Sequence, residues 1–181
     1  MYSRAKVLGH PIHTMLISFP IAFYTSSFVS FIVYQATGTV FWYRVGYVAD
    51  VAGVVMAIAA AIPGFIDWAT GIPAQSMAKR TGLVHLTLNV ISLAFFALNA
   101  LLASGTFNDA APDAAGAVFL TGIGFLVMLG AGYFGWSLVQ DHHVGINLSV
   151  AQENLEPDSS TGIPTRAHDI LGSGPQLPVT P

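Results

Sequence analysis

The sequence contains no cysteine and very little charge. Its 181 residues include six Lys and Arg and nine Asp and Glu, so charged residues make up 8% of the chain, whereas a soluble domain carries about a quarter. The absence of cysteine excludes disulfides, thiolate metal sites and cysteine-ligated iron–sulfur clusters. The few basic residues provide no positively charged face for nucleic acid. Glycine-rich phosphate loops, nucleophile elbows and paired catalytic carboxylates are also missing, which argues against a kinase or a hydrolase.

Long apolar stretches dominate what is present. Hydrophobic residues make up 54% of the chain, and a helix of roughly 20 apolar residues crosses a bilayer core of about 30 Å. Four stretches are long enough: Met15–Ala36, Val45–Trp68, Gly82–Ala103 and Ala115–Val139. The links between them are short, which favours antiparallel neighbours. We therefore predict an all-α integral membrane protein, an antiparallel four-helix bundle formed by residues 1–146.

The composition changes after residue 146. Residues 147–181 are rich in Pro, Ser and Gly and poor in aromatic residues. This segment therefore lacks the apolar surface that would order it as a separate domain. We predict an irregular, extended C-terminal tail of low complexity, whose partners are other membrane-protein subunits.

Basic residues near the ends of the spans indicate the orientation, because cytoplasmic loops carry an excess of Lys and Arg. Five of them fall on one side, and Arg44 falls in a loop on the other side. The five are Arg4, Lys6, Lys79, Arg80 and Arg166. Both termini are therefore predicted to be cytoplasmic, in a multi-pass protein that has the lipid bilayer as its first partner.

The stretch GHPIHTMLISFPIAF, residues 9–23, places two histidines at the start of the first span. Because the spans alternate in direction, the start of the third span and the ends of the second and fourth lie at the same end of the bundle. Five of the six histidines fall there, with one carboxyl and one amide: His10, His13, His85, His142, His143, Asp67 and Asn89. Residues spaced like His10 and His13, or His85 and Asn89, share one helix face. Polar residues in a span normally face the bundle interior and mark a functional site.

One interpretation of this cluster is a site for haem b. Haem iron takes axial imidazoles, and bundle cores hold cofactors between facing helices. The candidate ligands are histidines from three helices, one from the first span and one from the third or fourth: His10, His13, His85, His142 and His143. Basic side chains at the same membrane surface would neutralise the haem propionates: Lys6, Lys79 and Arg80. A single site at one face cannot carry electrons across about 30 Å of hydrocarbon, so it would exchange them with a quinone or with an iron–sulfur protein.

A second interpretation is a non-haem metal site. Neutral imidazole suits Fe, Cu and Zn, and a carboxylate completes the two-histidine, one-carboxylate pattern of non-haem iron. The candidate ligands are His10, His13, Asp67, His85 and His142. Alternatively, the carboxyl of Asp67 orients one of these histidines by a hydrogen bond.

A third interpretation has no cofactor and makes the protein a structural or assembly subunit of a larger membrane complex. In that case Asp67, Asn89 and His85 form a polar clamp between helices, worth about 1 kcal/mol per hydrogen bond.

Near the opposite end of the bundle, Asp50 is expected to pair with Arg44. The sequence leaves open whether the protein is an enzyme, and it favours an electron-transfer or accessory role over independent catalysis.

Four motifs, in this order, resemble a known family: GHPIHTMLISFPIAFY, GFIDW, HLTLN and LVQDHHVG. Over about residues 8–146 they look like the bacterial membrane-protein family of unassigned function numbered 2231. The resemblance implies a four-helix protein of the bacterial inner membrane. It also implies a redox or cofactor connection, since some members are linked to Rieske iron–sulfur modules. The chain departs from the family at Thr14, where a second proline is common, and at His143, where a glycine is usual after the histidine that corresponds to His142.

Overall fold

The computed structural model describes residues 5–8 and 10–145, most of which are helical. A two-stranded antiparallel ribbon, β1 (Lys6–Val7) and β2 (His10–Pro11), precedes the helices. The helices follow in chain order: α1 (Ile12–Leu16), α2 (Ser18–Thr37), α3 (Val40–Ile66), the π-helical segment η1 (Asp67–Gly71), α4 (Met77–Ser104) and α5 (Ala115–Gln140). The predicted tail, residues 147–181, falls in a second unit (Ile146–Pro181) that lies outside the described residues.

Four helical segments are long and apolar enough to cross a membrane: Ile12–Thr37, Val40–Gly71, Met77–Ser104 and Ala115–Gln140. This confirms the predicted all-α fold with four spans. The second span starts five residues earlier than predicted, because the chain reverses in a turn of two residues between α2 and α3. Gly38 adopts a left-handed conformation there, with φ of +66°, which glycine tolerates without strain. Arg44 consequently lies inside α3 rather than in a loop.

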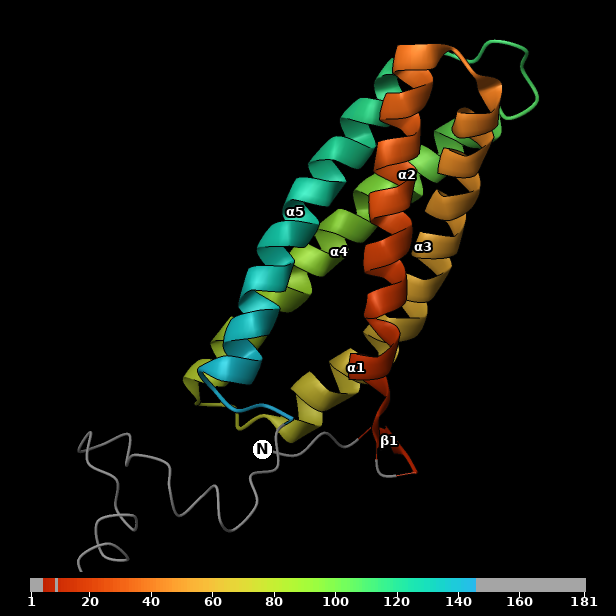
Figure 1. Cartoon of the computed structure of the whole chain (residues 1–181). Coiled ribbons are helices and arrows are strands. Elements are labelled where there is room, and N and C mark those ends of the chain that lie inside the picture. Colours follow the sequence, from red (N-terminus) through yellow and green to blue (C-terminus); the bar gives the residue numbers. More distant parts are fainter. Residues whose placement is uncertain (1–4, 9, 146–181) are drawn as a thin grey trace, which may run out of the picture. The chain divides into compact units, whose positions relative to one another are not determined.

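The four long helices form two hairpins, α2–α3 and α4–α5, and packing within each hairpin is more extensive than packing between them. Figure 1 shows that the hairpins cross near the α2–α3 turn and diverge toward the end where the chain begins. Glycine explains the close approach inside each hairpin. A Cβ at Gly53 would lie 2.6 Å from the ring of Tyr24, and one at Gly124 would lie 2.8 Å from the ring of Phe96. Small residues let helices in a membrane approach closely in this way.

The two hairpins repeat one packing pattern. Phe96 follows Tyr24 by 72 residues, and Gly124 follows Gly53 by 71 residues. In each hairpin the aromatic ring of the first helix lies over the glycine of the second. Because α2 and α4 run in the same direction, the two halves have the chain order of a parallel repeat.

The centre of the core lies where the two hairpins meet. The rings of Tyr24 and Phe96 stack with their centroids 3.7 Å apart and their planes 5° apart. Met128 is buried in the same cluster. A second buried cluster lies nearer the α2–α3 turn, where the ring of Phe31 meets the edge of Tyr43 at a centroid distance of 5.4 Å. These contacts hold the bundle together between the α2–α3 turn and the end that carries the histidines.

Candidate histidine site

His13 of α1 turns its ring into the first hairpin. Its Nδ1 lies 2.8 Å from the carbonyl oxygen of Ala60 on α3. A carbonyl oxygen can only accept, so Nδ1 carries the proton and donates it. The ring lies against Gly64, one helical turn further along α3, where a Cβ would come within 2.7 Å of the ring. Ala60 and Gly64 therefore supply the acceptor and the space for one imidazole.

His85 of α4 has the same surroundings in the second hairpin. Its Nδ1 lies 2.7 Å from the carbonyl oxygen of Ala131 on α5. Its ring lies against Gly135, where a Cβ would come within 2.8 Å of the ring. His85 follows His13 by the same 72 residues that separate the two stacked aromatic residues. The two histidines, called the histidine pair below, therefore occupy equivalent positions of the repeat.

Both imidazoles of the histidine pair are held in the same tautomer. A ring that donates Nδ1–H to a carbonyl presents a lone pair at Nε2, which is an atom that ligates metals. Both side chains are half-buried, and the two rings are close enough to interact electrostatically. Asn89 shares a helix face with His85, as predicted: its Nδ2 donates to the His85 carbonyl at 2.8 Å and to the lone pair of the ring Nε2 at 3.2 Å, so a metal bound at Nε2 would displace the second contact.

The other three histidines at this end have different surroundings. His10 is exposed, and its Nδ1 lies 3.0 Å from the carbonyl oxygen of Leu8 in the N-terminal ribbon. His142 follows α5, and its Nε2 lies 3.2 Å from Oγ1 of Thr81 at the start of α4. His143 is exposed, with φ of +51°. The five histidines do lie at one end of the bundle, as Figure 1 shows for the elements that carry them, but these three lack the glycine-backed environment of the histidine pair.

The predicted non-haem metal set is not assembled. Within residues 5–8 and 10–145, no three His, Asp or Glu side chains come together in a group that could hold a metal ion. Asp67, the predicted carboxylate ligand, accepts a hydrogen bond from the backbone N–H of Ala5 at 2.9 Å, which holds the N-terminal segment against η1. The side-chain hydrogen bonds of His85 and Asn89 are made within α4 and to α5. The bond between His85 and Asn89 is therefore present, and the clamp that adds Asp67 to them stays a prediction.

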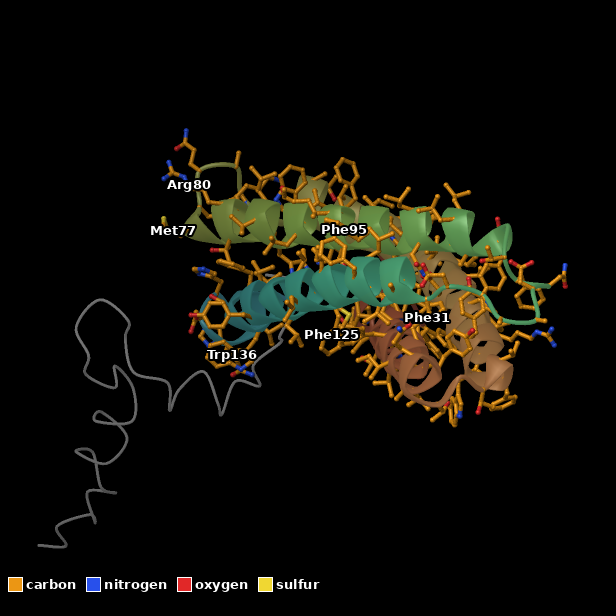
Figure 2. All side chains as sticks on the ribbon, turned by 90° about the horizontal axis from the view of Figure 1, so that it is seen from above. Phe31, Met77, Arg80, Phe95, Phe125 and Trp136 are labelled. Carbon is orange, nitrogen blue, oxygen red and sulfur yellow. The ribbon has the colours of Figure 1, made fainter. Side chains whose placement is uncertain are left out.

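The basic side chains at this end differ in what they contact. Lys79 Nζ donates to the backbone carbonyls of Trp68 and Ala69, and it lies 4.3 Å from the centroid of the Trp68 ring. It therefore satisfies carbonyls at the end of a helical segment, which lack partners within the helix. Arg80 is exposed and projects outward from the start of α4 (Figure 2). The Lys6 side chain lies outside the described part of the structure, and the contact of these three residues with propionates stays a prediction.

A buried polar pair lies further inside the bundle, and sequence reasoning missed it. Nδ2 of Asn99 donates to Oδ2 of Asp50 at 2.6 Å, and both residues are buried. The predicted pairing of Asp50 with Arg44 is wrong, because Asp50 lies on the face of α3 that carries the glycines packed against α2. The guanidinium of Arg44 lies instead 5.8 Å from the centroid of the Phe107 ring.

Comparison with known proteins places the chain in one family. The family model described as "Predicted membrane protein (DUF2231)" matches residues 9–148. The matched region contains the four candidate spans and both members of the histidine pair. No curated protein and no solved structure matches the chain.

Proposed function

This chain belongs to the DUF2231 family of predicted membrane proteins, whose function is unknown, and we propose that it is a haem b protein in which His13 and His85 would hold the haem. The four apolar helices make it a multi-pass membrane protein. With a bound haem, the bundle would have a redox function.

The observation that carries the proposal is the shared tautomer of the histidine pair. A metal-ligating histidine almost always donates its other N–H to a carbonyl, a carboxylate or water, which orients the ring and raises its basicity. Each hairpin presents one imidazole of this kind, with Nδ1 to carbonyl distances of 2.8 Å and 2.7 Å. Two equivalent imidazoles from two halves of a repeat would supply two ligands to one haem.

Haem suits this pair better than a lone metal ion does. Haem iron accepts two axial imidazoles from the protein and needs no further protein ligand. A zinc site needs at least three protein ligands, and the described residues contain no group of three. When bound, haem would supply one-electron chemistry, and the two hairpins would orient the imidazoles and exclude water.

We further propose that the electron partner lies at the histidine end. A site at one end is separated from the other membrane surface by most of the roughly 30 Å of hydrocarbon. The partner is then a quinone within the bilayer or an iron–sulfur protein at the surface. Lys79 and Arg80, at the start of α4, are the residues proposed to neutralise the propionates. In the orientation that the basic residues favour, this end faces the cytoplasm of a bacterial inner membrane.

The reduced-minus-oxidised absorption spectrum of the full chain, purified in mild detergent from haem-supplied cells, tests the proposal. The wild type is expected to show a Soret band and sharp α and β bands on dithionite reduction. His13→Ala and His85→Ala are each expected to lose this low-spin spectrum, because one axial ligand is missing. His10→Ala and His142→Ala are the matched controls and are expected to keep it, since they remove histidines at the same end but outside the repeated environment.

Circular dichroism and monodisperse elution would establish that each variant folds. If His10→Ala or His142→Ala lost the spectrum while His13→Ala kept it, the ligand assignment would be wrong. If the haem-supplied wild type showed no such bands, the proposal would fail, and His13 and His85 would be interhelical hydrogen bonds of a structural subunit.

A further inference from the structure

Four polar side chains, called the polar layer below, are buried in the interior of the bundle, one from each long helix: Ser27 of α2, Asp50 of α3, Asn99 of α4 and Thr121 of α5. None is more than 2% exposed. Their numbers follow the repeat, since Asn99 follows Ser27 by 72 residues and Thr121 follows Asp50 by 71 residues. The polar layer therefore consists of two pairs of equivalent positions, and the two halves of the repeat hold different polar residues at them.

In the first hairpin, two contacts between an aromatic ring and a glycine show where the polar layer lies along the helices. On one side the ring of Tyr24 lies on Gly53, and on the other side the ring of Phe31 lies on Gly46. The layer residues of α2 and α3 lie between these contacts along both helices. Ser27 is three residues from Tyr24 and four from Phe31, and Asp50 is three residues from Gly53 and four from Gly46. Residues at these spacings share one helix face. Ser27 and Asp50 therefore face each other across the interior of the hairpin.

Three buried oxygen atoms in this region have no hydrogen-bond partner: Asp50 Oδ1, Ser27 Oγ and Tyr24 Oη. Tyr24 and Asp50 also interact electrostatically. Buried polar atoms are almost always hydrogen-bonded, and an exception calls for an explanation such as a bound water or ion. All three atoms are oxygens with lone pairs, and the two hydroxyls can also donate a proton, so together they can surround a cation or share a proton with the carboxyl.

The carboxyl of Asp50 also lacks a positively charged partner among the described residues. Its hydrogen-bond partner is the Asn99 amide, the Tyr24 hydroxyl is within electrostatic range, and Ser27 lies opposite it in the hairpin, whereas no described Lys, Arg or His interacts with it. An unpaired carboxylate in a bundle interior is strongly unfavourable. A positive charge taken up from outside would remove that cost.

We propose that the polar layer is a binding site for one small monovalent cation, a proton or a sodium ion, which Asp50 Oδ1 binds together with the Ser27 and Tyr24 hydroxyls. The chemistry common to both occupants is a single positive charge on a carboxylate oxygen, surrounded by hydroxyl oxygens. A proton on Oδ1 turns the carboxyl into a hydrogen-bond donor to a hydroxyl, and a sodium ion takes the oxygens as ligands. The site lies ten residues along α3 from Ala60, roughly 15 Å by helical rise, and is independent of the histidine pair.

Thermal unfolding of the full chain in detergent tests this site and separates the two occupants. The unfolding midpoint is measured across a range of pH in choline chloride and in sodium chloride at equal ionic strength. For a proton, the midpoint falls as the pH rises, equally in both salts, because the unfolded chain releases a proton that the folded chain holds. For sodium, the midpoint at a fixed pH rises with sodium concentration and not with choline, by mass action. Asp50→Asn is expected to abolish either dependence.

Three variants complete the test. Asp109→Asn, at an exposed carboxyl in the α4–α5 loop, is the matched control and is expected to leave both dependences unchanged. Tyr24→Phe and Ser27→Ala keep the carboxyl and remove one oxygen each, and both are expected to weaken cation binding about tenfold. Phenylalanine fits at position 24, since Phe96 fills the equivalent position of the second hairpin.

Two results would overturn the proposal. In one, the wild type and Asp50→Asn show the same dependence on pH and on sodium. In the other, Asp50→Asn does not fold, and the wild type, Tyr24→Phe and Ser27→Ala respond identically to both. Neither result depends on whether haem binds, because the histidine pair is unchanged in all of these variants.

Discussion

Alanine at Gly53 and at Gly124 is expected to lower the free energy of unfolding by about 1–3 kcal/mol for each substitution. The added Cβ atoms would lie 2.6 Å from the ring of Tyr24 and 2.8 Å from the ring of Phe96. Neither ring can turn away, because both are buried and they stack on each other with centroids 3.7 Å apart. In lipid the association of helices depends on packing more than on the hydrophobic effect, so a clash at this centre acts directly on stability. Denaturant unfolding in detergent measures the change.

The control for this prediction is Gly132→Ala on α5, where a Cβ would meet nothing within 4 Å. Alanine favours a helix more than glycine does, so this variant is expected to be as stable as the wild type or slightly more stable. The double variant at Gly53 and Gly124 is expected to deviate from additivity, because both substitutions displace one shared ring stack. Equal stability of Gly53→Ala, Gly124→Ala and Gly132→Ala would show that the stack is not packed as described.

Asn99→Leu is expected to destabilise the bundle by about 1–3 kcal/mol. Leucine removes the amide that donates to Oδ2 of Asp50 at 2.6 Å. Both oxygens of the buried carboxyl then have no hydrogen-bond donor from the protein, since Oδ1 already has none. The cost arises from a polar group left unsatisfied, and the midpoint of thermal or denaturant unfolding measures it.

Asn99→Leu combined with Asp50→Leu separates this cause from a simple packing defect. When both polar partners become apolar, little or no penalty remains, so the double variant is expected to recover most of the lost stability. Asn89→Leu, on the same helix but exposed, is the single-variant control and is expected to change stability by less than about 0.5 kcal/mol. A double variant that is as unstable as Asn99→Leu alone would contradict the explanation.

Much of the fold was predictable from the sequence, because a long apolar run with few charges crosses a bilayer as a helix. The predicted starts and ends were least accurate at α3, where Gly38 allows a turn of two residues and brings Arg44 into the helix. The internal repeat was not predicted, since several equivalent positions hold different residues in the two halves, such as Tyr24 and Phe96 or Ser27 and Asn99. Its signal is a set of glycines spaced for one helix face, together with aromatic residues 72 positions apart.

The candidate site was predictable only in part. The gathering of five histidines at one end followed from the number of spans alone. The sequence did not distinguish His13 and His85 from the other three, because their shared environment depends on carbonyl oxygens and glycines about 50 residues away in the chain. Asp50 could have been assigned to the interior, since it lies on one helix face with Gly46 and Gly53, but its pairing with the Asn99 amide depends on how the two hairpins meet.

The sequence by itself determined the number of spans, their alternation and the end of the bundle at which the histidines collect, since these follow from hydropathy and chain direction. Only the tertiary structure decided which imidazoles share a tautomer and which carboxyl is buried. Hydropathy along the chain carries no information about which backbone carbonyl of a neighbouring helix a side chain meets. That contact depends on the close approach of helices at glycine, which is settled when the two hairpins pack.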